Sequence, residues 1–116
     1  MVNLDFVCKR VPIAQILRCS FSINRTEIDI MMLLIRENKE METVEIMKKV
    51  GKDKTTVQRA MKSLSEKELV HRKQINLERG GYVFVYYPVS KKYIKERIYK
   101  NLELFKENIG KEIERW

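Results

Sequence analysis

Two β-prone runs interrupt a chain whose other apolar residues recur at helical spacing. The runs are "VHRKQINL" at 70–77 and "YVFVYYPV" at 82–89, and they flank "ERGG" at 78–81. Val, Ile, Tyr and Phe on both sides of a Gly-Gly turn are typical of a β-hairpin, and Pro88 ends its second strand. The sequence therefore predicts a mainly α fold that carries one β-hairpin, within the α+β class.

Several helices are expected before the hairpin. A short one follows Pro12, because proline is favoured in a first helical turn. The next begins after Asn24, where Glu27 completes a capping-box pattern. Its buried stripe is predicted at i, i+3, i+4 and i+7, with one flanking residue: Ile28, Met31, Met32, Ile35 and Leu34. A third, short helix is predicted to end at Gly51, with Thr43 as cap and an inner side of Val44, Met47 and Val50.

The stretch "DKTTVQRAMKSLSEKELV" at 53–70 predicts a fourth helix at 54–67. Asp53 is a good N-cap, and Val57, Ala60, Met61 and Leu64 follow at helical spacing. A short helix, a glycine-containing turn and a capped second helix form a helix-turn-helix, and a hairpin directly after it is a wing. The chain then divides into an N-terminal helical segment (1–23), a winged helix-turn-helix domain (24–90) and a C-terminal helix (91–116).

Positive charge is concentrated around this fourth helix. The whole chain has a net charge of +8, and residues 48–73 hold nine Lys and Arg against three Asp and Glu. A concentrated cationic patch favours a polyanion as partner, and the second helix of a helix-turn-helix enters the major groove of double-stranded DNA. The residues expected to contact DNA are Lys52, Lys54, Thr55, Thr56, Gln58, Arg59, Lys62, Lys73, Arg79 and Gly80. The alternative is that this polar face is only the solvated side of a structural helix.

The last helix carries an apolar stripe along its whole length. Its members are Ile94, Ile98, Leu102, Phe105, Ile109, Ile113 and Trp116. Their mean spacing is close to the helical period of about 3.6 residues. One winged domain cannot easily cover so long a stripe, so we expect the terminal helices to form a homodimer. The alternative is that this helix folds back on its own domain.

Two cysteines, Cys8 and Cys19, fit no common zinc-ligand spacing. They are either small buried residues or a pair that senses redox state or metal, and the second reading makes the protein a thiol-responsive regulator. No cofactor is expected. A single histidine and the absence of a nucleophile–base pattern or phosphate loop argue against an enzyme. The absence of a long apolar run or signal peptide favours a cytoplasmic protein without a membrane partner.

Residues 53–88 also resemble archaeal winged-helix regulators of the TrmB/MarR-like kind. The similar positions include "DKTTVQR" at 53–59 and "NLERGGY" at 76–82. One departure is Glu68, where the family usually has glycine, which predicts a different end to the fourth helix. The resemblance implies a dimeric DNA-binding transcriptional regulator, and it names neither effector nor target. The alternative is a winged helix that serves as a protein-interaction module of the transcription machinery.

Overall fold

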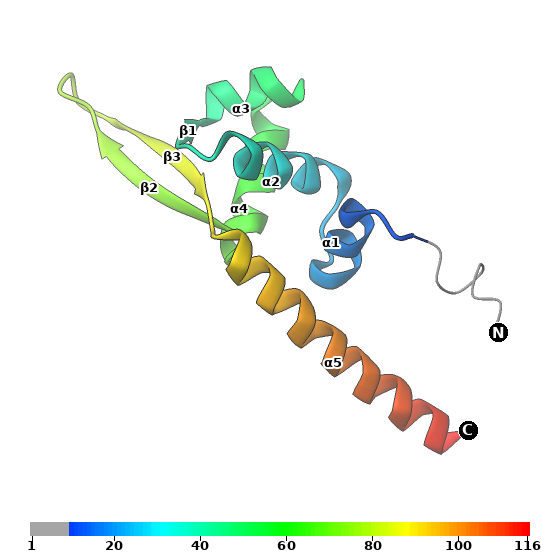
Figure 1. Cartoon of the computed structure of the whole chain (residues 1–116). Coiled ribbons are helices and arrows are strands. Elements are labelled where there is room, and N and C mark those ends of the chain that lie inside the picture. Colours follow the sequence, from blue (N-terminus) through cyan, green and yellow to red (C-terminus); the bar gives the residue numbers. More distant parts are fainter. Residues whose placement is uncertain (1–9) are drawn as a thin grey trace.

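Five helices and three strands make up the computed structural model, which describes residues 10–116. Their order is α1 (Ile13–Phe21), α2 (Arg25–Glu37), β1 (Met41–Glu42), α3 (Thr43–Val50), α4 (Lys54–Glu66), β2 (Val70–Asn76), β3 (Tyr82–Pro88) and α5 (Lys91–Arg115). Helices α1 to α4 gather into one body, the β2–β3 hairpin projects from one side of it, and α5 leads away from it (Figure 1). This arrangement confirms the predicted mainly α fold with a hairpin wing.

The sheet contains a third strand that the sequence did not reveal. Strand β3 lies in the centre, with β1 and β2 antiparallel on either side of it. Strand β1 is only two residues long, and Met41 in it pairs with Tyr86 and is fully buried. So short a strand has no detectable alternation of its own. It exists because β3 offers it backbone partners.

Helix α2 buries more of its circumference than the predicted stripe covers. Ile30 and Leu33 are buried, although they lie outside that stripe, whereas the predicted Met32 is 36% exposed. The stripe was wrong at these positions because α2 contacts α1, α3, α4 and β3. A helix surrounded by neighbours buries most of its circumference, so its apolar residues do not mark one inner face.

Helix α3 begins one residue earlier than predicted and turns a different face inward. Its N-cap is Glu42, and Thr43 is already helical. Ile46 is fully buried, whereas Val44, predicted to face the core, is 55% exposed. Strand β1 leads directly into α3, so the extended backbone of the strand determines where the helix begins and which side faces α4.

The caps of α2 and α4 agree with the sequence prediction. The Glu27 amide donates to Asn24 Oδ1 across 2.9 Å, and the Thr56 amide donates to Asp53 Oδ1 across 2.8 Å. The buried carboxylate of Glu27 also accepts a 2.7 Å hydrogen bond from Ser63 Oγ of α4. The start of α2 is thereby tied to α4, which carries the predicted DNA-contacting face.

Glu68 adopts the conformation that glycine would favour at the same position. Its φ is +59°, and the Leu69 amide donates to the Leu64 carbonyl oxygen across 2.9 Å. Helix α4 therefore closes with a left-handed residue although the glycine is missing. The expectation that Glu68 changes the helix end was wrong, because a non-glycine residue can take this conformation at a modest energetic cost.

Candidate nucleic-acid interface

A three-residue turn joins α3 to α4 and sets the start of α4 at the surface. Gly51 has a φ of +67°, and its amide donates to the Met47 carbonyl oxygen across 2.9 Å. Only glycine takes this left-handed conformation without steric cost. Asp53 then caps α4, so the turn supplies a stop for one helix and a start for the next.

The two faces of α4 differ as the sequence predicts. Val57, Ala60, Met61 and Leu64 are all buried in the core. Five of the expected DNA-contacting residues are exposed on this helix: Lys54, Thr55, Gln58, Arg59 and Lys62. Thr56 is half-buried, and its amide is committed to Asp53. The polar face is therefore held outward by the packing of the opposite face.

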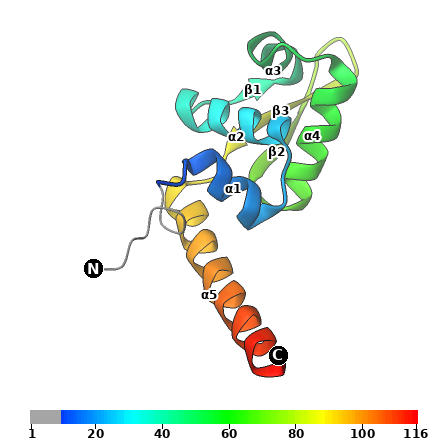
Figure 2. The ribbon, with the colours of Figure 1, turned by 90° about the vertical axis from the view of Figure 1, so that its right-hand side faces the viewer.

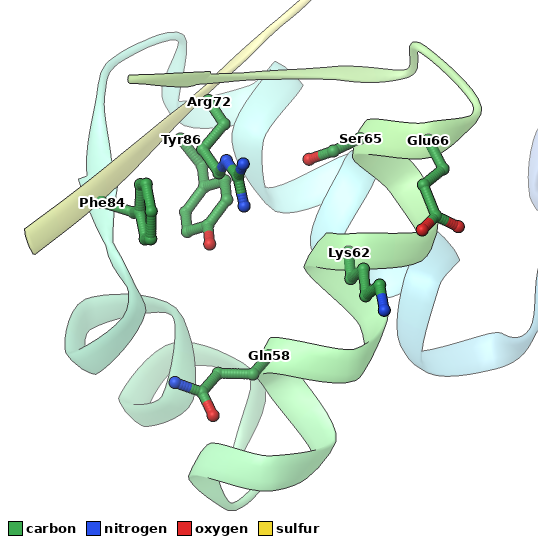
Figure 3. A pocket seen from close by; sticks show the side chains of 7 residues that line it. All are labelled: Gln58, Lys62, Ser65, Glu66, Arg72, Phe84 and Tyr86. Atoms are coloured by element: carbon green, nitrogen blue, oxygen red, sulfur yellow. The ribbon is translucent and has the colours of Figure 1, made fainter. Parts of the chain in front are cut away.

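A pocket of about 520 Å³ separates α4 from the wing. Gln58, Lys62, Ser65 and Glu66 line it from α4, whereas Arg72, Phe84 and Tyr86 line it from the strands (Figure 3). The Arg72 guanidinium lies 4.4 Å from the centroid of the Phe84 ring. This cation–π contact orients a positive charge towards the polar side chains of α4.

The sheet places Lys73 and Arg72 on opposite faces. Arg72 pairs with Tyr86 and Lys73 with Val85, and successive side chains of a strand alternate between faces. Of the two, Arg72 shares the pocket with Gln58 and Lys62. The sequence predicted Lys73 rather than Arg72, because the face of a strand residue depends on register, which the sequence does not display.

The tip of the wing lies away from α4. The Leu77 amide donates to the Gly81 carbonyl oxygen across 3.0 Å, and Gly80 and Gly81 have φ values of +89° and +79°. Arg79 is exposed in this loop. Figure 1 shows the loop projecting beyond the helices, and neither Arg79 nor Gly80 lines the pockets beside α4.

A second pocket, of about 420 Å³, continues the concave surface towards α3. It shares Gln58 and Phe84 with the first pocket, and Val44 and Tyr82 also line it. Tyr82 is 57% exposed, whereas Tyr86 on the same strand is buried. Val44 was predicted to face the core and Tyr82 was not predicted as a surface residue, because an apolar residue at the surface has the same sequence pattern as one in the core.

Several cations of the surface are free of carboxylate partners. Within residues 10–116, no carboxylate oxygen lies within 4.0 Å of the charged groups of Lys52, Lys54, Arg59 or Lys62. Lys49, by contrast, lies 3.2 Å from Glu37, and this hydrogen-bonded pairing lowers the pKa of Glu37. The cations around α4 therefore keep their charge available to an external anion.

The cap of α4 places a negative charge at the start of this helix. Hydrogen bonds from the side chain and amide of Thr56 lower the pKa of Asp53, and the charges of Arg59 and Lys52 act in the same direction. Asp53 is thus held ionised at the N-terminus of the helix, where the helix dipole favours a negative charge.

Only one of the two predicted cysteines lies within the described residues. Cys19 is exposed on α1, and Cys8 lies outside residues 10–116. In the described part of the chain, no three His, Cys, Asp or Glu side chains are grouped to hold a metal ion. The redox role of these cysteines stays a prediction.

The winged helix-turn-helix has a counterpart among known families. The model of the family described as the sugar-specific transcriptional regulator TrmB matches residues 17–92. The chain belongs to the TrmB family. The predicted resemblance is confirmed, and the chain is a transcriptional regulator of the winged-helix type.

Individual relatives of this TrmB-family chain agree with that assignment. The uncharacterized protein MJ1082 of Methanocaldococcus jannaschii is 32% identical over 103 residues, covering 89% of this chain and 84% of that protein. A structure described as a possible transcriptional regulator from Methanosarcina mazei Go1 has a TM-score of 0.85 and 31% identity, and covers 100% of this chain and 96% of its own.

A more distant structure shares the fold of this TrmB-family chain. It is a mutant of S. aureus MepR bound to an oligodeoxyribonucleotide, with a TM-score of 0.56, 15% identity, and coverage of 89% of this chain and 72% of its own. The winged-helix fold therefore includes a protein that binds a nucleic acid. Within residues 10–116, no helix is long and apolar enough to cross a membrane.

Proposed function

We propose that this chain is a sequence-specific double-stranded DNA-binding transcriptional regulator that acts as a homodimer. The observation that carries the proposal is the exposed face of α4, where Gln58, Arg59 and Lys62 project opposite a fully packed face. An amphipathic surface helix ordinarily carries both signs of charge on its polar side. Here the first three turns present cations and amides with no carboxylate partner in the described part of the chain.

The side chains of α4 suit the base edges of a major groove. An arginine can donate two hydrogen bonds to guanine, and a glutamine can exchange two with adenine. Arg59 and Gln58 are assigned these roles, Lys62 joins them at the bases, and Thr55 contacts a base or a phosphate. Glu66 lies about one turn beyond Lys62 and two turns beyond Arg59, and its carboxylate would repel a phosphate, so the contact surface ends before it.

Other residues suit the DNA backbone. Lys52, Lys54 and Thr56 surround the start of α4, where phosphates flank a groove-bound helix. Arg79, Gly80 and Lys73 extend the contact along the wing, because an exposed arginine at a loop tip can reach a minor groove or a phosphate. Arg72 joins this set, since Phe84 holds its guanidinium beside Gln58 and Lys62.

The homodimer rests on the second half of α5. Leu102, Phe105, Ile109, Ile113 and Trp116 are at least 44% exposed. Ile94 and Ile98, the first two members of the predicted stripe, are buried in the chain's own core. A second copy would cover the exposed part and place two recognition helices about one DNA turn, or about 34 Å, apart.

The test is DNA binding by the purified protein. Operator fragments found by genome-wide site mapping are footprinted with the wild type and with Arg59→Ala. Loss of a base contact is expected to cost about 1–3 kcal/mol and to relax specificity at one position. Arg18→Ala, an equal change of charge on the exposed side of α1, is the matched control. Equal affinity and equal footprints for the two variants would show that α4 does not read DNA.

A further inference from the structure

Beyond Phe105, α5 extends away from the other elements of residues 10–116, whereas Leu102 and Phe105 still line a pocket with Cys19 and Ser20 of α1. Figure 2 shows this part of the helix extending alone beyond α1. Phe105 is 59% exposed, and Trp116, at the end of the helix, is fully exposed. Large apolar residues that repeat along one helix face in this way mark an interaction site.

An apolar pocket lies at the other end of the same helix face. It has a volume of about 530 Å³ and is formed where α1, α2 and α5 meet. Its apolar lining residues are Ile13, Leu17, Met32, Ile35, Ile94 and Ile98. Three cations, Arg36, Lys91 and Lys95, also line it. The pocket thus suits an aromatic or aliphatic side chain whose neighbouring residues are acidic.

The apolar positions of α5 are nearly symmetric about Phe105. They lie 3, 7 and 11 residues before it and 4, 8 and 11 residues after it. If a second copy of α5 runs antiparallel with Phe105 beside its equivalent, Leu102 lies within one residue of the level of Ile109, and Trp116 lies at the level of Ile94. Ile94 and Ile98 are buried in their own core, so the direct contact between the two helices falls to the exposed residues around Phe105. Since Ile94 lines the α1/α2/α5 pocket, this register brings Trp116 of one copy to the pocket of the other.

We propose that two chains pair their α5 helices antiparallel about Phe105 and that Trp116 of each copy occupies the α1/α2/α5 pocket of the other. This proposal rests on the proposed homodimer and adds its register and its anchor residue. Charge supports it, because Glu112 and Glu114 precede Trp116 on α5, whereas Arg36, Lys91 and Lys95 line the pocket. A buried tryptophan beside cations also gains cation–π attraction, and tryptophan is among the side chains that dominate interfaces.

Other antiparallel registers also align apolar residues. Centred between Leu102 and Phe105, the two helices pair Leu102 with Phe105, Ile98 with Ile109 and Ile94 with Ile113. Centred on Ile109, they pair Phe105 with Ile113 and Leu102 with Trp116. In the first of these registers Trp116 lies opposite Lys91, and in the second it lies opposite Leu102. The Phe105 register places Trp116 opposite Ile94, which lines the α1/α2/α5 pocket, and it is the one proposed.

The Phe105 and Ile109 registers predict different disulfides across the two-fold axis. In a Cys8→Ser, Cys19→Ser background, Phe105→Cys is expected to form a disulfide-linked dimer under mild oxidation, because a residue on the axis lies beside its own equivalent. Ile109→Cys, one helical turn away, is expected to remain largely uncrosslinked, since a disulfide needs Cα atoms within about 7 Å. Efficient crosslinking of Ile109→Cys with none of Phe105→Cys would overturn the proposal.

The chain's single tryptophan reports occupancy of the pocket directly. Trp116 emission should shift to shorter wavelength as the protein concentration rises and dimers form. Met32→Lys, which places a charge in the pocket at a half-exposed position, should reverse that shift and weaken dimerisation at least about ten-fold. Leu104→Lys, on the opposite side of α5, is the control and should change neither. If Met32→Lys changes neither the Trp116 emission nor self-association, Trp116 does not occupy this pocket.

These measurements use the full chain without DNA, so they separate the two proposals. A Phe105-crosslinked dimer that binds no operator would leave the inference standing and refute DNA reading. A protein that binds operator DNA but stays monomeric in sedimentation at all concentrations would refute both this inference and the homodimer.

Discussion

Arg97 of α5 donates a hydrogen bond from Nη1 to the main-chain carbonyl oxygen of Lys67, across 2.6 Å. Lys67 is the C-cap of α4, and the same guanidinium lies 4.9 Å from the ring centroid of Phe21 in α1. The Lys67 side chain in turn donates to the Ser22 carbonyl oxygen across 2.9 Å. One cation therefore joins α1, α5 and the end of α4. In the proposed dimer, it links the recognition helix to the helix that pairs with the second copy.

Arg97→Ala should destabilise the fold by about 1–3 kcal/mol, because it leaves a partly buried carbonyl oxygen without its charged donor. Urea unfolding gives the free energy. Lys100→Ala, one turn further along α5 and exposed, is the matched control and should stay within about 0.5 kcal/mol of the wild type. Equal stabilities for the two variants would show that the Lys67 contact does not contribute.

Glu68→Gly should stabilise the protein by about 0.5–1 kcal/mol. The residue has a φ of +59°, a conformation that costs an L-residue energy and costs glycine none, and the greater freedom of glycine in the unfolded chain offsets part of the gain. Thermal or urea unfolding provides the measurement.

The same substitution two residues earlier is the control for Glu68→Gly. Glu66→Gly lies within α4 and should destabilise by about 1 kcal/mol, because glycine is a poor helix former. If both variants lose stability, the left-handed residue at 68 carries no strain.

Low pH should lower the free energy of unfolding by protonating Asp53. The pKa of Asp53 is lowered in the folded state by hydrogen bonds from Thr56, so the ionised form stabilises the fold. That contribution is fully present above the unfolded pKa, about 3.9 for an aspartate, and it disappears as the pH falls through the lower folded pKa.

Asp53→Asn keeps an oxygen at the cap but cannot titrate in this range. Its free energy of unfolding should therefore depend less on pH than that of the wild type below about pH 4. Glu103→Gln, at an exposed position of α5, should follow the wild type. If the free energy of unfolding of Asp53→Asn falls with acid as steeply as that of the wild type, Asp53 does not cause the loss of stability at low pH.

Lys54→Ala should weaken binding to all DNA sequences by a similar factor. Each phosphate contact releases counterions, so the slope of log K against log salt concentration should fall by about 1. Titrations at several salt concentrations measure it. Lys106→Ala, with the same change of charge on the far half of α5, controls for the loss of net charge. Equal slopes for the two variants would remove Lys54 from the phosphate contacts.

Local signals account for the elements that the sequence predicted well. Asn24 and Asp53 begin α2 and α4 as expected, and Gly51 ends α3. Caps and turns depend on residues within a few positions of one another, so their chemistry is visible in the sequence.

Features built from distant residues were missed. Strand β1, the buried side of α3 and the exposure of Met32 depend on which elements lie alongside, and periodicity carries no information about neighbours. The position of Arg72 beside Gln58 depends on the register between β2 and β3. The sequence likewise did not separate Ile94 and Ile98, which complete the chain's own core, from the rest of the stripe.

The sequence by itself determined the order of the elements, the wing and the polar face of α4, because each follows from the period and chemistry of a short segment. Only the tertiary structure decided which of those polar side chains converge and which apolar residues remain exposed. Packing brings residues such as Arg72 and Gln58 together across segments that share no local signal. It also uses the first two turns of α5 for the chain's own core and leaves the side chains of Phe105 and Trp116 largely exposed.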